Sequence, residues 1–210
     1  MTIEKIISIM ENVFTYKNFD EEFLEEFCDR YNLSFRYGET RWVIYCDSWK
    51  EVLKIPRYNN IQEDINHCDI ELEYYEYSKE WGLEKIFLPI RKVAVLRSGV
   101  EIYAQTKFTC AVCETGYRKR EKIEEKVNFD YSRLSKVNAM EKRWEMYDAD
   151  RISPIWWARA WQIYGKVFMR KLQDFTQELE LGDLHGNNVG WLGNQPIILD
   201  YAGFNSCDLI

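Results

Sequence analysis

The sequence predicts an α+β protein in which a mainly β half is followed by a mainly α half that ends in a hairpin. Three observations support this fold class. Apolar residues recur at helical spacing over residues 3–30. Short runs rich in Val, Ile, Tyr and Phe alternate with turn residues between 33 and 108, which is typical of strands. Helical spacing returns over residues 155–179.

Residues 3–30 are expected to form two short helices, because Asn18 and Asp20 supply a break and a cap between two apolar groups. Residues 33–56 then read as three strands separated by two turns, one at Gly38-Glu39-Thr40 and the next at Cys46-Asp47-Ser48. The acidic and aromatic segment 61–81 suits a helix. Residues 88–96 and 100–108 predict two more strands around a Ser98-Gly99 turn.

The second half begins with a charge run over residues 117–126, which we interpret as a solvated helix face. Residues 155–179 predict one long amphipathic helix that starts after Ser153-Pro154. The segment 189–201 reads as a strand, a Gly-Asn turn and a second strand.

Composition excludes several classes of protein. The 210 residues are 46% hydrophobic, so disorder is a poor description. The formal net charge of −7 argues against nucleic acid or an anionic membrane as a default partner. No run approaches the roughly 18 apolar residues that a membrane span needs. The first residues lack a signal-peptide pattern and the six cysteines are scattered, so we expect reduced thiols and a cytoplasmic location.

Oxygen-bearing side chains gather near the end of the sequence. Asp183 and Asn188 come before the expected hairpin, and Asp200 follows its second strand. Oxygen ligands suit Mg²⁺, which commonly shares them with substrate phosphates. The pattern therefore favours a metal-nucleotide site. The other candidate metal motif, Cys110-Ala-Val-Cys113, lacks a matching second pair, so ordinary thiols are the preferred interpretation.

The two segments around these side chains resemble a known family. D-L-H-x-x-N at Asp183–Asn188 and I-L-D-Y-x-G at Ile198–Gly203 are similar to the catalytic and metal-binding loops of the protein-kinase-like superfamily. The form is that of the aminoglycoside and choline phosphotransferases and of small, many of them phage-encoded, kinase-like proteins. The resemblance implies a two-lobed fold with ATP and Mg²⁺ as cofactors.

With that resemblance, the chain divides into an N-terminal helical segment at 1–30, an N-lobe with an antiparallel sheet and one helix at 31–112, and a reduced, mostly helical C-lobe at 113–210. The resemblance implies roles at the C-terminal end. Asp183 is the base or substrate-orienting acid, and His185 lies in the same catalytic loop. Asn188 and Asp200 are the metal ligands.

The resemblance also implies a nucleotide site in the N-lobe. Lys54, in the apolar run Val52–Pro56, corresponds to the strand lysine that contacts phosphates. Gly38 and Arg41 lie where the first hairpin covers the nucleotide. The lysine should pair with a helix glutamate, for which we choose Glu71. Two further glutamates, Glu73 and Glu76, stay open as alternatives.

Two departures from the family leave other functions open. Leu181 stands where the family often has His, and only seven residues follow Gly203, so a peptide substrate lacks an obvious docking surface. A second copy of the chain or another protein is one way to complete the substrate site. The first hypothesis is a phosphotransferase whose acceptor is a protein or small-molecule hydroxyl. The alternatives are a pseudokinase or nucleotide-binding interaction module acting through a protein partner, and an unrelated α+β interaction domain.

Overall fold

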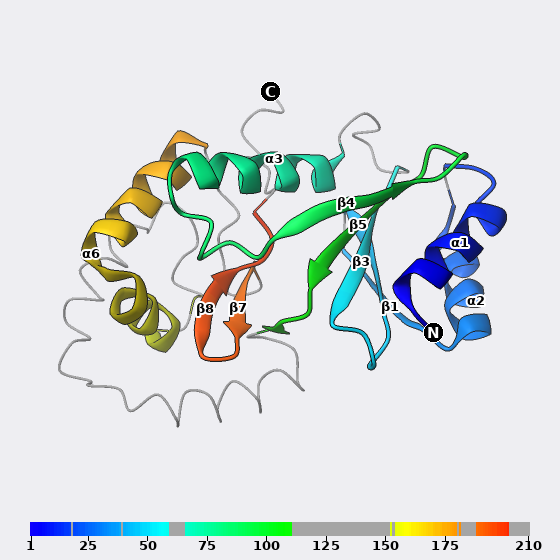
Figure 1. Ribbon diagram of the computed structural model, residues 1–210, viewed down its shortest axis with the longest axis horizontal. Helices are drawn as coiled ribbons and strands as arrows, with labels where there is room; N and C mark the ends of the chain where they lie inside the picture. Colours follow the sequence, from blue (N-terminus) through cyan, green and yellow to red (C-terminus); the bar gives the residue numbers. More distant parts are fainter. Residues whose placement is uncertain are drawn as a thin grey trace. The chain divides into compact units, whose positions relative to one another are not determined.

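The computed structural model describes residues 1–17, 19–38, 40–58, 66–110, 152, 154–179, 181 and 188–201 (Figure 1). These residues form an α+β protein. The chain divides into two compact units. The first comprises Met1–Glu73 and Pro89–Lys107, and the second comprises Tyr74–Leu88 and Phe108–Ile210. The expected N-terminal helical segment is part of the first unit.

The first unit begins with the two helices that the sequence predicts, α1 (Ile3–Val13) and α2 (Glu21–Tyr31). Each starts at a capping side chain, because the first N–H groups of a helix have no partner within it. The Thr2 hydroxyl accepts from the backbone N–H of Lys5 at 3.3 Å. The Asp20 carboxylate accepts from the N–H of Phe23 at 2.9 Å, which confirms Asp20 as a cap.

A five-stranded antiparallel sheet forms the centre of this unit. Its members are β1 (Ser34–Tyr37), β2 (Arg41–Tyr45), β3 (Glu51–Pro56), β4 (Ile90–Val95) and β5 (Glu101–Thr106). The strand order is β1-β2-β3-β5-β4, so β5 lies between β3 and β4. Helix α3 (His67–Glu80) lies between β3 and β4 in the sequence. The five expected strands and the helix near 61–81 are therefore confirmed.

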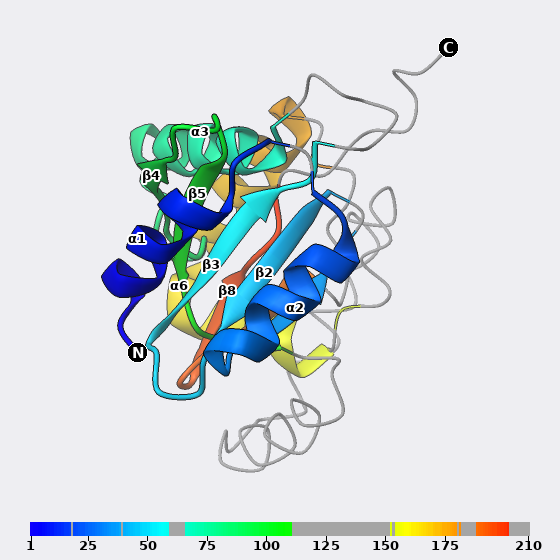
Figure 2. The ribbon, with the colours of Figure 1, turned by 90° about the vertical axis from the view of Figure 1, so that its right-hand side faces the viewer.

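The two faces of the sheet differ because side chains alternate along a strand. One face is apolar, with Trp42, Ile44, Leu53 and Ile55 buried in a core that also contains Met10, Leu24 and Phe27 from α1 and α2. Figure 2 shows both helices on this side of the sheet. The opposite face presents the polar residues Arg41, Lys54 and Gln105, and all three are buried. Polar groups buried on one face need partners, and α3 supplies them.

The second unit contains α6 (Pro154–Glu178) and a small sheet of β6 (Thr109–Cys110), β7 (Val189–Leu192) and β8 (Gln195–Ile198) in the order β6-β7-β8. The expected hairpin is confirmed, with Gly193 at a φ of 62° in its turn. Strand β6 is an addition, since the sequence predicts no pairing there. Tryptophans dominate the core, and Trp156 donates from Nε1 to the carbonyl of Gly190 at 2.9 Å.

The single long helix predicted over 155–179 is wrong in one respect. Gly165 has φ 79° and ψ 166°, so two helices meet there at a kink (Figure 1). This backbone conformation is essentially restricted to glycine. The periodic apolar pattern continues through the kink, which is why the pattern did not indicate it. The charge run at 117–126 lies outside the described residues. Within the part of the chain that is described, no helix is both long and apolar enough to cross a membrane.

Candidate functional site

The buried face of the first sheet positions a lysine. Lys54 lies in the middle of β3, where its backbone is paired in register with Val43 of β2 and Tyr103 of β5. Its side chain is only 7% exposed. A buried ammonium needs an anionic partner, because the cost of removing the charge from water is otherwise several kcal/mol.

That partner is Glu71, on the first part of α3. The Nζ of Lys54 lies 2.9 Å from Oε1 and 2.8 Å from Oε2 of Glu71. The carboxylate has no exposed surface. The structure therefore brings together the lysine and the glutamate that the resemblance pairs. The two alternatives do not reach Lys54, since Glu73 is exposed and Glu76 forms a surface ion pair with Lys79 at 2.6 Å.

Two further side chains bind the same carboxylate. Arg41 donates from Nη1 to Oε2 of Glu71 at 2.7 Å. Gln105, on β5, donates from Nε2 to Oε1 at 2.9 Å. Glu71 thus accepts from three side chains on three neighbouring strands. Two buried cations, Arg41 and Lys54, therefore share one carboxylate.

The turn between β1 and β2 is fixed by Arg57. The N–H of Gly38 donates to the carbonyl of Arg41 at 3.0 Å, which closes the hairpin. Arg57 then donates from its side chain to the carbonyl of Gly38 at 2.8 Å and from its backbone to the carbonyl of Thr40 at 2.9 Å. Its guanidinium also lies 4.4 Å from the centre of the Trp42 ring. These contacts fix the backbone of the turn that leads into Arg41, the first residue of β2. Gly38 itself does not adopt a positive φ, and a Cβ there would meet nothing within 4 Å.

Asn188 and Asp200 flank the second hairpin, in the other unit. Asn188 directly precedes β7, and its backbone carbonyl accepts from the N–H of Leu199 at 2.9 Å. Because Leu199 directly precedes Asp200, both side chains belong to the same open end of the hairpin. Asn188 is buried and Asp200 is half-buried. An amide oxygen and a carboxylate at one place are ligands that Mg²⁺ accepts.

Some predicted residues lie outside this description. Asp183 and His185 belong to the undescribed segment 182–187. Among the residues that are described, no group of three or more His, Cys, Asp or Glu side chains could hold a metal ion. The two hairpin residues would therefore bind a metal only together with other ligands, such as the phosphate oxygens of a nucleotide.

Sequence reasoning missed Gln105 and the role of Arg41 as a second cation on Glu71. A signal for Gln105 exists, because it is the polar member of the buried run Ile102–Gln105 and lies two residues beyond Tyr103, the register partner of Lys54. Alternation then places Gln105 on the face of the sheet that Lys54 occupies. Comparison of the chain with protein-family models, with curated proteins and with solved structures finds no match.

Proposed function

We propose that this protein is an ATP- and Mg²⁺-dependent phosphotransferase with a two-lobed, protein-kinase-like fold, which transfers a phosphoryl group to a hydroxyl of a protein or a small molecule. The observation that carries the proposal is the ion pair between Lys54 on the third strand and Glu71 on the helix that follows it. Protein kinases use a lysine on the third strand and a glutamate on the next helix in this way, and the pair must be in place for catalysis.

The charge of the Lys54 group supports binding of a phosphate. Arg41 and Lys54 lie together on one carboxylate, and a phosphate placed beside them would be attracted by both cations. Glu71 also fixes the direction of the Lys54 side chain, which reduces the entropy that a flexible lysine would lose when it binds a phosphate. Arg41 adds a planar group that can bind phosphate oxygens in pairs.

Asn188 and Asp200 are the residues that would hold Mg²⁺ in this proposal. Bound there with a nucleotide, Mg²⁺ would neutralise the charge that develops on the phosphates during transfer. The oxygen donors of Asn188 and Asp200 fit that ion, and the phosphates complete its coordination. The buried position of Asn188 limits the freedom of its side chain before binding.

The reaction in this proposal moves one proton and one phosphoryl group. The acceptor hydroxyl oxygen attacks the γ-phosphorus while the bond to the oxygen between the β- and γ-phosphates breaks, and ADP leaves. Asp183 orients the hydroxyl and takes its proton, which is the role of the catalytic-loop aspartate in the kinase motif.

Two measurements test the proposal. Calorimetry should detect ATP binding to the wild-type protein in Mg²⁺, with affinity lowered at least tenfold in Lys54→Met and unchanged in Lys50→Met, an exposed lysine just before β3. Transfer of labelled γ-phosphate to small molecules, cell extract or the protein itself should then be lost in Asp183→Asn. Failure of the wild-type protein to bind ATP contradicts the proposal. Binding without any transfer instead supports the nucleotide-binding interaction module.

A further inference from the structure

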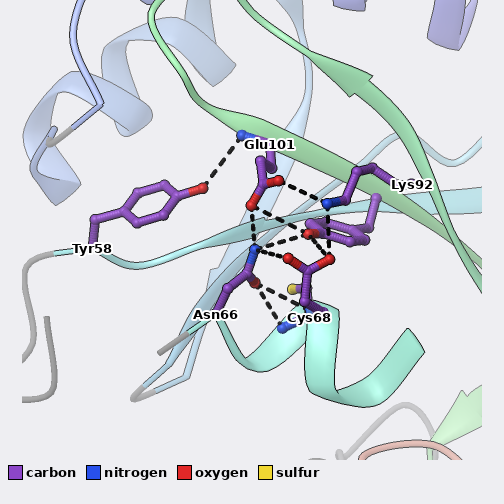
Figure 3. Close-up of polar contacts among 7 residues, drawn as sticks. Tyr58, Asn66, Cys68, Lys92 and Glu101 are labelled. Atoms are coloured by element: carbon purple, nitrogen blue, oxygen red, sulfur yellow. Dashed lines mark hydrogen bonds and ion pairs between the residues drawn. The ribbon is translucent and has the colours of Figure 1, made fainter. Parts of the chain in front are cut away.

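A second polar network surrounds the start of α3, and Asn66 is its centre (Figure 3). Asn66 directly precedes the helix, and its side-chain Oδ1 accepts from the backbone N–H groups of Cys68 at 3.0 Å and Asp69 at 3.2 Å. This contact caps the helix, because it gives partners to N–H groups that the first turn leaves unpaired.

The other end of the Asn66 amide reaches the sheet. Its Nδ2 lies 2.8 Å from the hydroxyl of Tyr103 and also contacts a carboxylate oxygen of Glu101, both on β5. The same nitrogen lies 3.1 Å from Oδ2 of Asp69, on the helix. One side chain therefore binds the helix through its oxygen and joins helix and strand through its nitrogen.

Lys92, which is labelled in Figure 3, and Tyr103 complete this network. The ammonium of Lys92, on β4, lies 2.9 Å from Asp69 and 2.7 Å from Glu101. The Tyr103 hydroxyl donates to Asp69 at 2.6 Å. Burial and this contact with Asp69 raise the pKa of Tyr103, so the hydroxyl keeps its proton and stays a donor. Strands β4 and β5 are thus both connected by side-chain contacts to the first turn of α3.

The network lies beside the Lys54 group in the same unit. Tyr103 is the register partner of Lys54, and Glu71 lies two residues after Asp69 on the helix. Side chains two positions apart leave an α-helix in directions that differ by about 200°. Asp69 and Glu71 therefore reach the sheet from opposite sides of the helix axis. A rotation of α3 about its own axis that moves Asp69 away from its partners on the sheet would therefore also displace Glu71 from Lys54.

We propose that Asn66, Tyr103 and Lys92 are positioning residues that keep Glu71 on Lys54. The importance of this positioning for phosphoryl transfer rests on the proposed function, but the positioning itself does not. Glu71 ties the helix to β2, β3 and β5 at one residue. The Asn66 network attaches the same helix to β4 and β5 at its first turn.

The test separates capping from attachment to the sheet. Asn66→Asp keeps an oxygen that can cap α3 but removes the Nδ2 donor and sets a negative charge beside Glu101. The readout is the rate at which an amine-acylating reagent modifies Lys54, followed by mass spectrometry without nucleotide, with exposed Lys50 as the internal reference. We expect the Lys54 rate to rise at least fivefold, because the released ammonium becomes accessible, while the Lys50 rate stays constant.

Two matched variants sharpen this test. Asn12→Asp makes the same replacement on α1, where the Asn12 amide contacts only the carbonyl of Ser8 among the described residues, at 2.9 Å, and should leave the Lys54 rate unchanged. The double variant Asn66→Asp, Glu101→Gln reverses donor and acceptor while it conserves the total charge. The new amide on β5 could then donate to the new carboxylate at the start of α3 and still accept from Lys92. This double variant should restore at least half of the protection of Lys54.

A wild-type Lys54 rate in Asn66→Asp, with an unchanged circular dichroism spectrum, overturns the proposal and leaves Asn66 as a cap alone. A raised rate that the double variant does not lower also overturns it, because donor–acceptor complementarity would then not matter. If Asn66→Asp fails to fold, Tyr103→Phe removes a single hydroxyl and should raise the Lys54 rate in the same way. None of these outcomes depends on ATP binding, so they are independent of the proposed function.

Discussion

Lys54 contacts both carboxylate oxygens of Glu71, at 2.9 and 2.8 Å, although the two residues are 17 positions apart in the chain. The strand places the lysine on the face of the sheet that α3 covers, and the first part of the helix places the glutamate opposite it. Arg41 and Gln105 approach the same carboxylate from the neighbouring strands. One buried carboxylate therefore joins three neighbouring strands to the helix.

Replacement of Glu71 by glutamine should destabilise the first unit. The change removes the carboxylate that Lys54 and Arg41 share, and breaking a buried pair by removing one partner typically costs about 3–5 kcal/mol. Urea unfolding followed by circular dichroism measures the difference in free energy. Glu73→Gln is the matched control, because Glu73 is exposed on the same helix and should change stability by less than about 0.5 kcal/mol. Equal effects of the two substitutions would contradict the assigned pairing.

Replacement of Asp200 by alanine should remove the effect of Mg²⁺ on nucleotide binding. In the proposed function Asp200 supplies a carboxylate ligand, so its loss weakens ATP binding in Mg²⁺ and leaves the weaker, metal-free binding unchanged. Calorimetric titration of ATP with and without Mg²⁺ measures both affinities.

The control for this substitution is Asp174→Ala, which removes an exposed carboxylate from α6. It should retain the full gain in affinity from Mg²⁺. If Asp200→Ala keeps that gain as well, the metal ligands lie elsewhere.

Gly165→Ala should destabilise the second unit. A Cβ at this position meets nothing within 4 Å, so the cost comes only from the backbone, at φ 79° and ψ 166°. Such a conformation costs about 1–3 kcal/mol for a residue other than glycine. Denaturant unfolding measures the loss, with Lys166→Ala at the next, exposed position as the control. An increase in helical circular dichroism without loss of stability would mean that alanine straightens α6.

Among Cys28, Cys46 and Cys68, Cys46 should react first with a thiol reagent. Hydrogen bonding from Ser48 lowers the pKa of Cys46, so a larger fraction is thiolate at neutral pH. Burial raises the pKa of Cys28 to about 12, which keeps that thiol protonated, and Cys68 is buried as well. Iodoacetamide labelling at neutral pH with peptide mapping compares the three rates. Ser48→Ala should slow labelling of Cys46, whereas equal labelling of Cys28 in the native protein would be inconsistent with its burial.

The local elements could be predicted because their signals are local. Short runs rich in β-branched and aromatic residues, separated by turn residues, placed the five strands, and helical spacing with a capping Asp20 placed the first two helices. The choice of Lys54 came from the resemblance of Val52–Pro56 to the lysine strand of the protein-kinase-like superfamily, and Glu71 was one of three glutamates on a single helix. The spacing from Lys54 narrowed the candidates to Glu71, Glu73 and Glu76, but the sequence did not indicate which of the three is buried.

Tertiary structure decided which groups meet. The insertion of β5 between β3 and β4 brings Gln105 beside Lys54, and the turn before β2 brings Arg41 to the same carboxylate. The kink at Gly165 also escaped prediction, because an apolar stripe can continue across a break in the backbone. The spacing and polarity of neighbouring residues determine whether each segment forms a helix or a strand and which of its faces is apolar. The partners of a buried charge depend on strand order and burial, which are properties of the whole folded unit.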